Sequence, residues 1–151
     1  MIEVCEVTAR TDLDIAFSIR EEVFTIEQGV SREDEFDEYD DYSHHFLAYF
    51  NQTPCGTARW RKTDKGVKLE RFCVLKNFRG KGLGSSLVEK ALESVQSKEG
   101  PVYLYLHAQT DVIGLYEKHG FKTVGEIFYE CEIAHKVMVK NNRSIFVSPR
   151  D

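Results

Sequence analysis

A glycine-rich turn in the middle of the chain limits the possible folds more than any other feature of the sequence. Residues 79–84 read Arg-Gly-Lys-Gly-Leu-Gly, with an apolar run at 69–75 before them and an amphipathic helical pattern after them. Glycine lets backbone N–H groups approach a ligand closely, and a helix start presents unpaired N–H groups at the positive end of its dipole. A strand, a glycine turn and a helix start in this order predict a site for phosphate oxygens.

Two familiar phosphate-binding sequences do not fit this turn. A P-loop requires Gly-x-x-x-x-Gly-Lys-Ser/Thr, but Lys81 is followed by Gly82. A Rossmann fingerprint requires Gly-x-Gly-x-x-Gly near the first strand, whereas these glycines lie mid-chain with Gly-x-Gly-x-Gly spacing. The spacing that fits is Arg-x-x-Gly-x-Gly, from Arg79 through Gly82 to Gly84. An ordinary strand-to-helix turn is the alternative to a ligand site.

Length and composition indicate one soluble domain spanning residues 1–151. The chain is 42% hydrophobic and 30% charged, which suffices for a sizeable core. Its formal net charge of -5 argues against nucleic acid as a partner and is compatible with cationic substrates. No apolar run is long enough for a membrane span and no signal peptide begins the chain, so we expect a cytoplasmic protein. Four widely spaced cysteines are expected to be reduced, namely Cys5, Cys55, Cys73 and Cys131.

The order of expected elements indicates a mixed α/β (α+β) fold. Helices are expected after a capping box formed by Thr11 and Asp14, from the glycine turn to Gly100, and near residues 111–119. The acidic residues 31–41 form a short helix or a loop, and residues 141–151 form a C-terminal tail with weak signals. A strand–helix–strand crossover carries the glycine turn in a mixed central sheet flanked by helices. Strands are expected at residues 2–8, 46–50, 56–61, 67–75, 102–108, 121–124, 128–132 and 136–140.

A second motif lies at residues 115–121, which read Leu-Tyr-Glu-Lys-His-Gly-Phe. This motif and its distance from the glycine turn resemble the GNAT N-acetyltransferases, whose acyl-CoA pyrophosphate loop carries Arg-x-x-Gly-x-Gly. The chain, to about residue 140, further resembles the ElaA/YjcF-like branch of that family. It departs from the branch at Glu70 and at Cys131-Glu132, where a small residue and Asp-Gly are usual. The narrower resemblance rests on Ile19-Arg20, Val23-Phe24, Glu27-Gln28-Gly29-Val30, Glu35-Phe36-Asp37, Asp40, His45, Ala108-Gln109, Ile133, His135 and Met138.

The resemblance implies the GNAT fold and direct transfer of an acetyl group from acetyl-CoA to a primary amine of a small molecule or peptide. We expect a monomer or homodimer. Backbone groups at the end of the strand before the turn would bond the pantetheine amides, and one N–H would stabilise the developing oxyanion. A domain that holds acyl-CoA without turnover, as a sensor or interaction module, is the alternative. The expected CoA-binding residues are Cys73, Val74, Leu75, Arg79, Gly80, Lys81, Gly82, Leu83, Gly84, Ser85, Gln109 and Tyr116.

Tyr116 is the expected general acid. By the resemblance it lies near the sulfur of CoA, where a positioned phenol can donate a proton to the leaving thiolate. A phenol with a pKa of about 10 is a weak acid, so proximity has to compensate for strength. The alternative is a packing role for Tyr116 beneath the short helix. Cys73 is expected to be a small packed residue rather than a nucleophile.

The general base and the acceptor site are less defined by the sequence. Glu70 is our expected catalytic carboxylate, with a surface or ion-paired carboxylate as the alternative. Glu27, Asp37, His45 and His135 are expected to bind the acceptor or to take its proton. Water could carry that proton instead. Seven carboxylates in residues 33–41 predict a cationic acceptor held near residues 27–41, with a solvated acidic face as the alternative. These carboxylates lack the spacing of a calcium loop, so no metal is expected.

Overall fold

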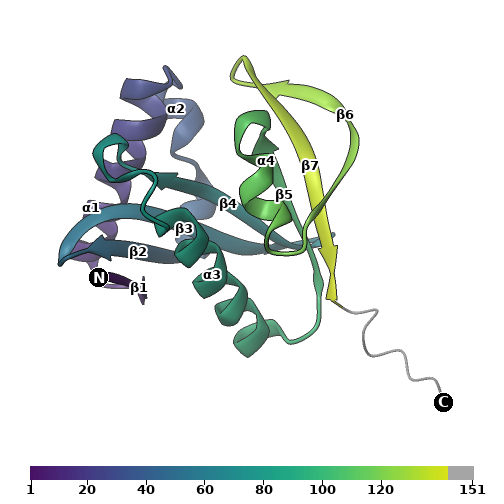
Figure 1. The fold of residues 1–151 in the computed structure, drawn as a ribbon, viewed down its shortest axis with the longest axis horizontal. Coiled ribbons are helices and arrows are strands. Elements are labelled where there is room, and N and C mark those ends of the chain that lie inside the picture. Colours follow the sequence, from purple (N-terminus) through teal and green to yellow (C-terminus); the bar gives the residue numbers. More distant parts are fainter. Residues whose placement is uncertain (143–151) are drawn as a thin grey trace.

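Seven strands form one sheet in the order β1-β2-β3-β4-β5-β7-β6 (Figure 1). The structure, a computed structural model, describes residues 1–142. All neighbouring strands are antiparallel except β4 and β5, which are parallel. The expected mixed sheet is therefore confirmed. The strands are β1 (Ile2–Val7), β2 (His44–Phe50), β3 (Thr53–Thr63), β4 (Gly66–Val74), β5 (Tyr103–Gln109), β6 (Lys122–Glu130) and β7 (Ile133–Asn141).

Helices cover both faces of the sheet. The long helix α3 (Leu83–Glu99) packs its buried stripe against residues of β2, β3, β4 and β5, and it ends at Gly100 as expected. On the opposite face, α1 (Arg10–Arg20) continues into π-helical turns over Glu21–Glu27. Alternate residues of β2 divide between the two cores, with Phe46 facing α3 and Leu47 facing α1. The shorter helices are α2 (Arg32–Glu35), α4 (Ile113–Glu117) and 3₁₀ turns at Glu38–Tyr42, Lys76–Phe78 and Thr110–Val112.

The capping box expected at the start of α1 is wrong. The helix begins at Arg10 behind Ala9, which provides no side-chain cap, and Thr11 lies inside the first turn. Asp14 instead accepts a hydrogen bond from Arg10, one helical turn earlier, at 3.0 Å. The apolar stripe of this helix was correctly expected, because Ala16, Ile19 and Val23 are buried.

The last part of the sheet also differs from the expectation. The strands expected at residues 121–124 and 128–132 fall mainly within one strand, β6 (Lys122–Glu130), which is interrupted by a register shift between Val124 and Phe128. The turn to β7 uses Cys131 and Glu132, both with positive φ, in a two-residue hairpin that usually favours Asn-Gly or Asp-Gly. The C-terminal tail was expected at residues 141–151, but Asn141 is the last residue of β7. Residues 143–151 of that tail lie outside the described part of the chain.

β4 and β5 separate to form a fork. Within the described register, residues 67–69 pair with residues 104–106, although β4 continues to Val74 and β5 to Gln109. A bulge lies inside the fork, because Arg59 pairs with Glu70 and Thr57 with Cys73, leaving Arg71 and Phe72 together opposite one residue. Arg71 has a φ of 61°, a left-handed conformation that is uncommon for a residue with a side chain. Such bulges change the direction in which a strand presents its side chains.

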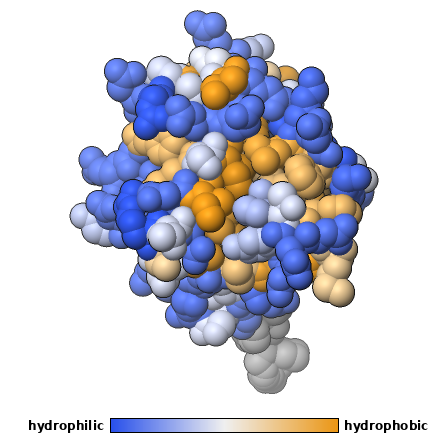
Figure 2. Space-filling model, turned by 90° about the vertical axis from the view of Figure 1, so that its left-hand side faces the viewer, coloured by the Kyte–Doolittle hydropathy of each residue, from blue (hydrophilic) through white to orange (hydrophobic). Residues whose placement is uncertain are grey.

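The outer surface combines polar and apolar regions. Figure 2 shows one face of the molecule on which hydrophobic residues gather at the centre and hydrophilic residues surround them. Among residues 1–142, no helix is both long and apolar enough to cross a membrane.

Candidate active site

A cleft of about 1040 Å³ occupies the fork between β4 and β5. Its walls come from the two strand ends, the glycine turn, the start of α3, α4 and the β6–β7 hairpin. Of the expected CoA-binding residues, Leu75, Lys81 and Ser85 do not line it. The expected residues that do are Cys73, Val74, Arg79, Gly80, Gly82, Leu83, Gly84, Gln109 and Tyr116. The structure thus brings together most of a set that is spread over 44 positions of the sequence, from 73 to 116.

The glycine turn leads directly into the N-terminus of α3. Gly82 has a φ of 92° and occupies the position that caps the helix. The first bond of the helix runs from the N–H of Ser86 to the carbonyl of Gly82 at 3.1 Å, so the N–H groups of Leu83, Gly84 and Ser85 precede the helical ladder. Because Gly82, Leu83 and Gly84 line the cleft, the positive end of the dipole of a 17-residue helix lies at the cleft wall. The arrangement suits a polyphosphate.

Arg79 holds a defined position before the turn. Its Nε donates to the carbonyl of Val74 at 2.8 Å, and its two terminal nitrogens bond the carboxylate of Glu27 at 2.7 Å each. Hydrogen bonds from Arg79 lower the pKa of Glu27. The side chain of Arg79 is 41% exposed, so a phosphate group could exchange with Glu27 as its partner.

Gln28, the residue after Glu27, contacts β5, the other strand of the fork. The side-chain amides of Gln28 and Gln109 bond each other reciprocally at 2.9 and 3.3 Å. Gln109 is the last residue of β5, and Gln28 directly follows the π-helical turns. Residues 27 and 28 therefore contact both β5 and the turn after β4. π-Helical turns change the direction of the side chains that follow them and occur frequently at functional sites.

Tyr116 lines the cleft from α4. Its ring packs edge-on against Phe72 and Phe121, with ring centroids 5.8 and 6.3 Å apart. Burial raises the pKa of its phenol, so the hydroxyl stays protonated at neutral pH and acts as a donor. Burial likewise raises the pKa of Cys73, which keeps that thiol neutral and unreactive. Both states agree with the roles expected from the sequence, which the structure does not test.

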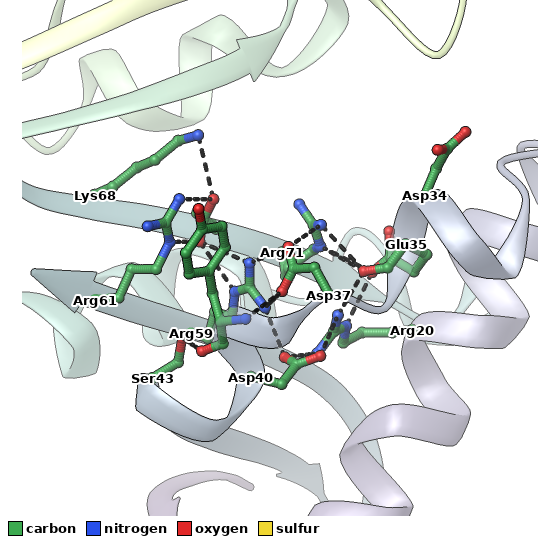
Figure 3. Close-up of polar contacts among 12 residues, drawn as sticks. Arg20, Asp34, Glu35, Asp37, Asp40, Ser43, Arg59, Arg61, Lys68 and Arg71 are labelled. Carbon is green, nitrogen blue, oxygen red and sulfur yellow. Dashed lines mark hydrogen bonds and ion pairs between the residues drawn. The ribbon is translucent and has the colours of Figure 1, made fainter. Parts of the chain in front are cut away.

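A network of arginines and carboxylates fixes the acidic segment against the sheet (Figure 3). Arg20 bonds Glu35 at 2.9 Å and Asp40 at 2.7 Å, and Arg59 bonds Asp37 at 2.9 Å and Asp40 at 2.6 Å. The side chains of Arg20 and Arg59 are each only 1% exposed. Three of the seven carboxylates behind the prediction of a cationic acceptor are thus neutralised inside the protein. That prediction depends on the other four and stays a prediction.

The same network locks the bulge of β4. Arg71 bonds Glu35 at 3.1 Å and Asp37 at 3.3 Å, so its unusual backbone conformation is held by two ion pairs. Glu70, its neighbour, contacts Arg59 at 2.9 Å, Arg61 at 2.8 Å and Lys68 at 3.2 Å.

Glu70 is a weak base in this setting. Burial alone would raise the pKa of Glu70, but the surrounding cations, Arg59 first, lower it to about 2. Glu70 lines the cleft, and its catalytic role stays a prediction that its charge partners do not favour.

The other expected base and acceptor residues are dispersed. Asp37 and His135 line the cleft. Glu27 does not line it but bonds Arg79, which does. His45 lies outside the cleft: its Nε2 contacts the carbonyl of Asp40 at 2.9 Å, and burial lowers its pKa.

A histidine–carboxylate pair that was not expected from the sequence also lines the cleft. His107 on β5 contacts Glu130 on β6 at 2.8 Å, and Glu130 approaches His135 on β7 at 3.8 Å. His107 and Glu130 are 23 positions apart, and only the pairing of β5 with β7 and β7 with β6 brings them together.

Known proteins are similar to this chain in sequence. Residues 15–142 match the sequence model of a family described as acetyltransferase (GNAT) domain. The uncharacterised N-acetyltransferase YjcF of Bacillus subtilis is 42% identical over 127 residues, which cover 83% of this chain and 90% of YjcF. Protein ElaA of Escherichia coli is 30% identical over 122 residues, which cover 78% of this chain and 80% of ElaA.

Solved structures share its fold. The crystal structure of Escherichia coli ElaA matches with a TM-score of 0.83 at 27% identity, over 93% of this chain and all of that one (100%). A GNAT family acetyltransferase from Elizabethkingia anophelis with acetyl-CoA bound matches with a TM-score of 0.61 at 19% identity, over 91% and 94% of the two chains. This second likeness concerns the fold alone.

Proposed function

This chain belongs to the GNAT family of acetyltransferases, in its ElaA/YjcF-like branch, and we propose that it moves an acetyl group from acetyl-CoA to a primary amine by direct attack. The observation that carries the proposal is the convergence of three features on one cleft. The fork of β4 and β5, the glycine turn at the start of α3, and Tyr116 all face it. A cytoplasmic location, one domain for the whole chain, and a monomer or homodimer remain parts of the proposal.

The residues of the cleft suit acetyl-CoA. The N–H groups at the start of α3 and the guanidinium of Arg79 would hold the pyrophosphate. Cys73 and Val74 line the cleft beyond the last pair of β4 with β5, and the backbone of β4 there would bond an extended amide chain, although the carbonyl of Val74 already accepts from Arg79. The Elizabethkingia anophelis relative, described as binding acetyl-CoA, has the same fold.

The proposed reaction needs three contributions from the protein. A base takes a proton from the ammonium form of the acceptor, and the free amine attacks the thioester carbonyl. A backbone N–H in the fork would stabilise the negative oxygen that develops there. As the carbon–sulfur bond breaks, the hydroxyl of Tyr116 would donate to the departing sulfur, and the second proton that the attacking nitrogen loses would return to the phenolate. The acceptor is an amine of a small molecule or peptide.

A panel of amines tests the proposal. Protein and acetyl-CoA are incubated with each amine, release of free thiol is followed, and mass spectrometry detects the acetylated product. We expect both signals with at least one amine, and loss of both in Tyr116→Phe. Binding of acetyl-CoA without thiol release from any amine would favour the alternative, a sensor or interaction module.

A further inference from the structure

His107 is the first residue of β5 beyond its last pair with β4. The final pair joins Leu69 to Leu106, so His107 and Glu70 stand at the point where the two strands part. The side chain of His107 is 26% exposed and lines the cleft that also contains Tyr116. The imidazole therefore borders the cleft beside the point where the strands part, which is where the proposed acceptor and thioester would meet.

Glu130 fixes the tautomer of His107. Its Oε2 lies 2.8 Å from Nδ1 of His107, and this hydrogen bond lowers the pKa of Glu130. An ionised carboxylate can only accept, so the shared proton resides on Nδ1. The lone pair on Nε2 is then left as a proton acceptor.

The charged and aromatic neighbours hold this pair in place. The ring of Phe128 packs edge-on against His107 at 5.1 Å and stacks on His135 at 5.7 Å. His135 contacts the other oxygen of Glu130 at 3.8 Å, while its Nδ1 contacts the carbonyl of Ile133 at 2.7 Å. Lys68 on β4 adds positive charge near Glu130. The ring of Tyr105, which is on β5 like His107, lies beside that imidazole.

The other candidate bases are engaged elsewhere. Ion pairs with arginines or lysine hold Glu27, Asp37 and Glu70, and the pKa of each carboxyl is lowered. His45 lies outside the cleft, and His135 has its Nε2 toward Glu130 at 3.8 Å with a side chain only 9% exposed, against 26% for His107.

We propose that His107, oriented by Glu130, is the general base that takes the proton from the acceptor amine. This assignment rests on the proposed acetyl transfer. Nε2 of His107 forms a bond to the departing ammonium proton, the N–H electron pair stays on nitrogen, and that pair attacks the carbonyl carbon. The imidazolium proton passes to solvent after transfer. Glu130 is a positioning residue, because it acts through His107.

The test combines turnover with a readout that does not need it. His107→Ala is compared with the parent using an amine that the parent acetylates, and with His44→Ala as control. His44 stacks on Trp60 at 4.0 Å and does not line the cleft. We expect kcat of His107→Ala to fall about 10²–10⁴-fold, with the Kd for acetyl-CoA unchanged, and added imidazole to restore part of the rate. Imidazole should not change the rate of His44→Ala.

Nitrogen NMR of the imidazole provides the second readout. We expect the Nδ1–H tautomer of His107 in the parent, and a share of the Nε2–H tautomer in Glu130→Gln together with a lower kcat. The assignment is overturned if His107→Ala turns over within threefold of the parent, or if the parent shows the Nε2–H tautomer. A parent that acetylates no amine refutes the proposed function and the base with it, whereas an active parent matched by His107→Ala refutes the base alone.

Discussion

Two glycines of the turn should respond in opposite ways to the same substitution. Gly82 has a φ of 92°, and among the described residues a Cβ there would meet Ile2 at an ordinary 3.7 Å. Gly82→Ala therefore costs mainly backbone strain, roughly 1–2 kcal/mol. Gly84 lies in the first turn of α3, where a Cβ would meet Leu115 at 3.4 Å. Because alanine favours helix, Gly84→Ala should stabilise the protein by roughly 0.5–1 kcal/mol.

The two variants should thus differ in stability by about 1.5–3 kcal/mol, or roughly 3–12 °C in Tm for a chain of this size. Denaturant and thermal unfolding measure the difference, and calorimetry measures CoA binding. We expect Gly84→Ala to bind CoA within threefold of the parent, since its methyl group points to α4. Gly82→Val, which adds a branched side chain beside the helix start, should bind at least tenfold more weakly.

Equal stability of Gly82→Ala and Gly84→Ala would refute the left-handed conformation assigned to the turn. Unchanged CoA affinity in a folded Gly82→Val protein would remove the turn from the binding site.

Three further predictions follow from the site. Tyr116→Phe should lower kcat about 10²-fold or more and leave the Kd for CoA unchanged; equal turnover in rapid single-turnover measurements would reduce Tyr116 to packing. Glu27→Gln should tighten CoA binding by up to about fivefold in calorimetry, because an exposed pair with Arg79 is worth about 0.2–1 kcal/mol; weaker binding would contradict this competition. The pKa of Glu70 is lower folded, about 2, than unfolded, so its stabilisation is complete at neutral pH and disappears as pH falls from about 4.5 to 2. It is on the order of 3 kcal/mol, so the stability gap between the parent and Glu70→Gln should close over that range in urea titrations; a constant gap would contradict the lowered pKa.

The elements with strong periodicity could be predicted from the sequence. The stripe of α3, the burial of Ala16, Ile19 and Val23, and the strand–turn–helix around residues 69–84 all follow from local spacing. The expected start of α1 was wrong because Asp14 has a competing local partner in Arg10. One strand was wrongly expected as two, at residues 121–124 and 128–132, because a bulge after Val124 interrupts the alternation of β6 without ending the strand.

The electrostatics of the site could not be predicted. Residues 33–41 read as an exposed acidic run, yet Asp37 bonds Arg59, which lies 22 positions later on another strand. A buried arginine in a strand gives no periodic signal different from that of an exposed one. The pair of His107 and Glu130 has the same origin, since strand order and register decide which distant side chains meet.

The short pairing of β4 with β5 divides the sheet into two parts, β1 to β4 and β5 to β7, joined directly through three residue pairs. Residues 70–74 of β4 are paired with β3 but lie beyond the register with β5, so their amide groups that face β5 have no ladder bond to that strand. They should exchange hydrogen with solvent faster than the amides of residues 67–69, despite lying in the middle of the sheet. A bound pantetheine arm would behave as a temporary eighth strand: it would slow exchange in β4 and β5 alike and make the two parts of the sheet open as one unit.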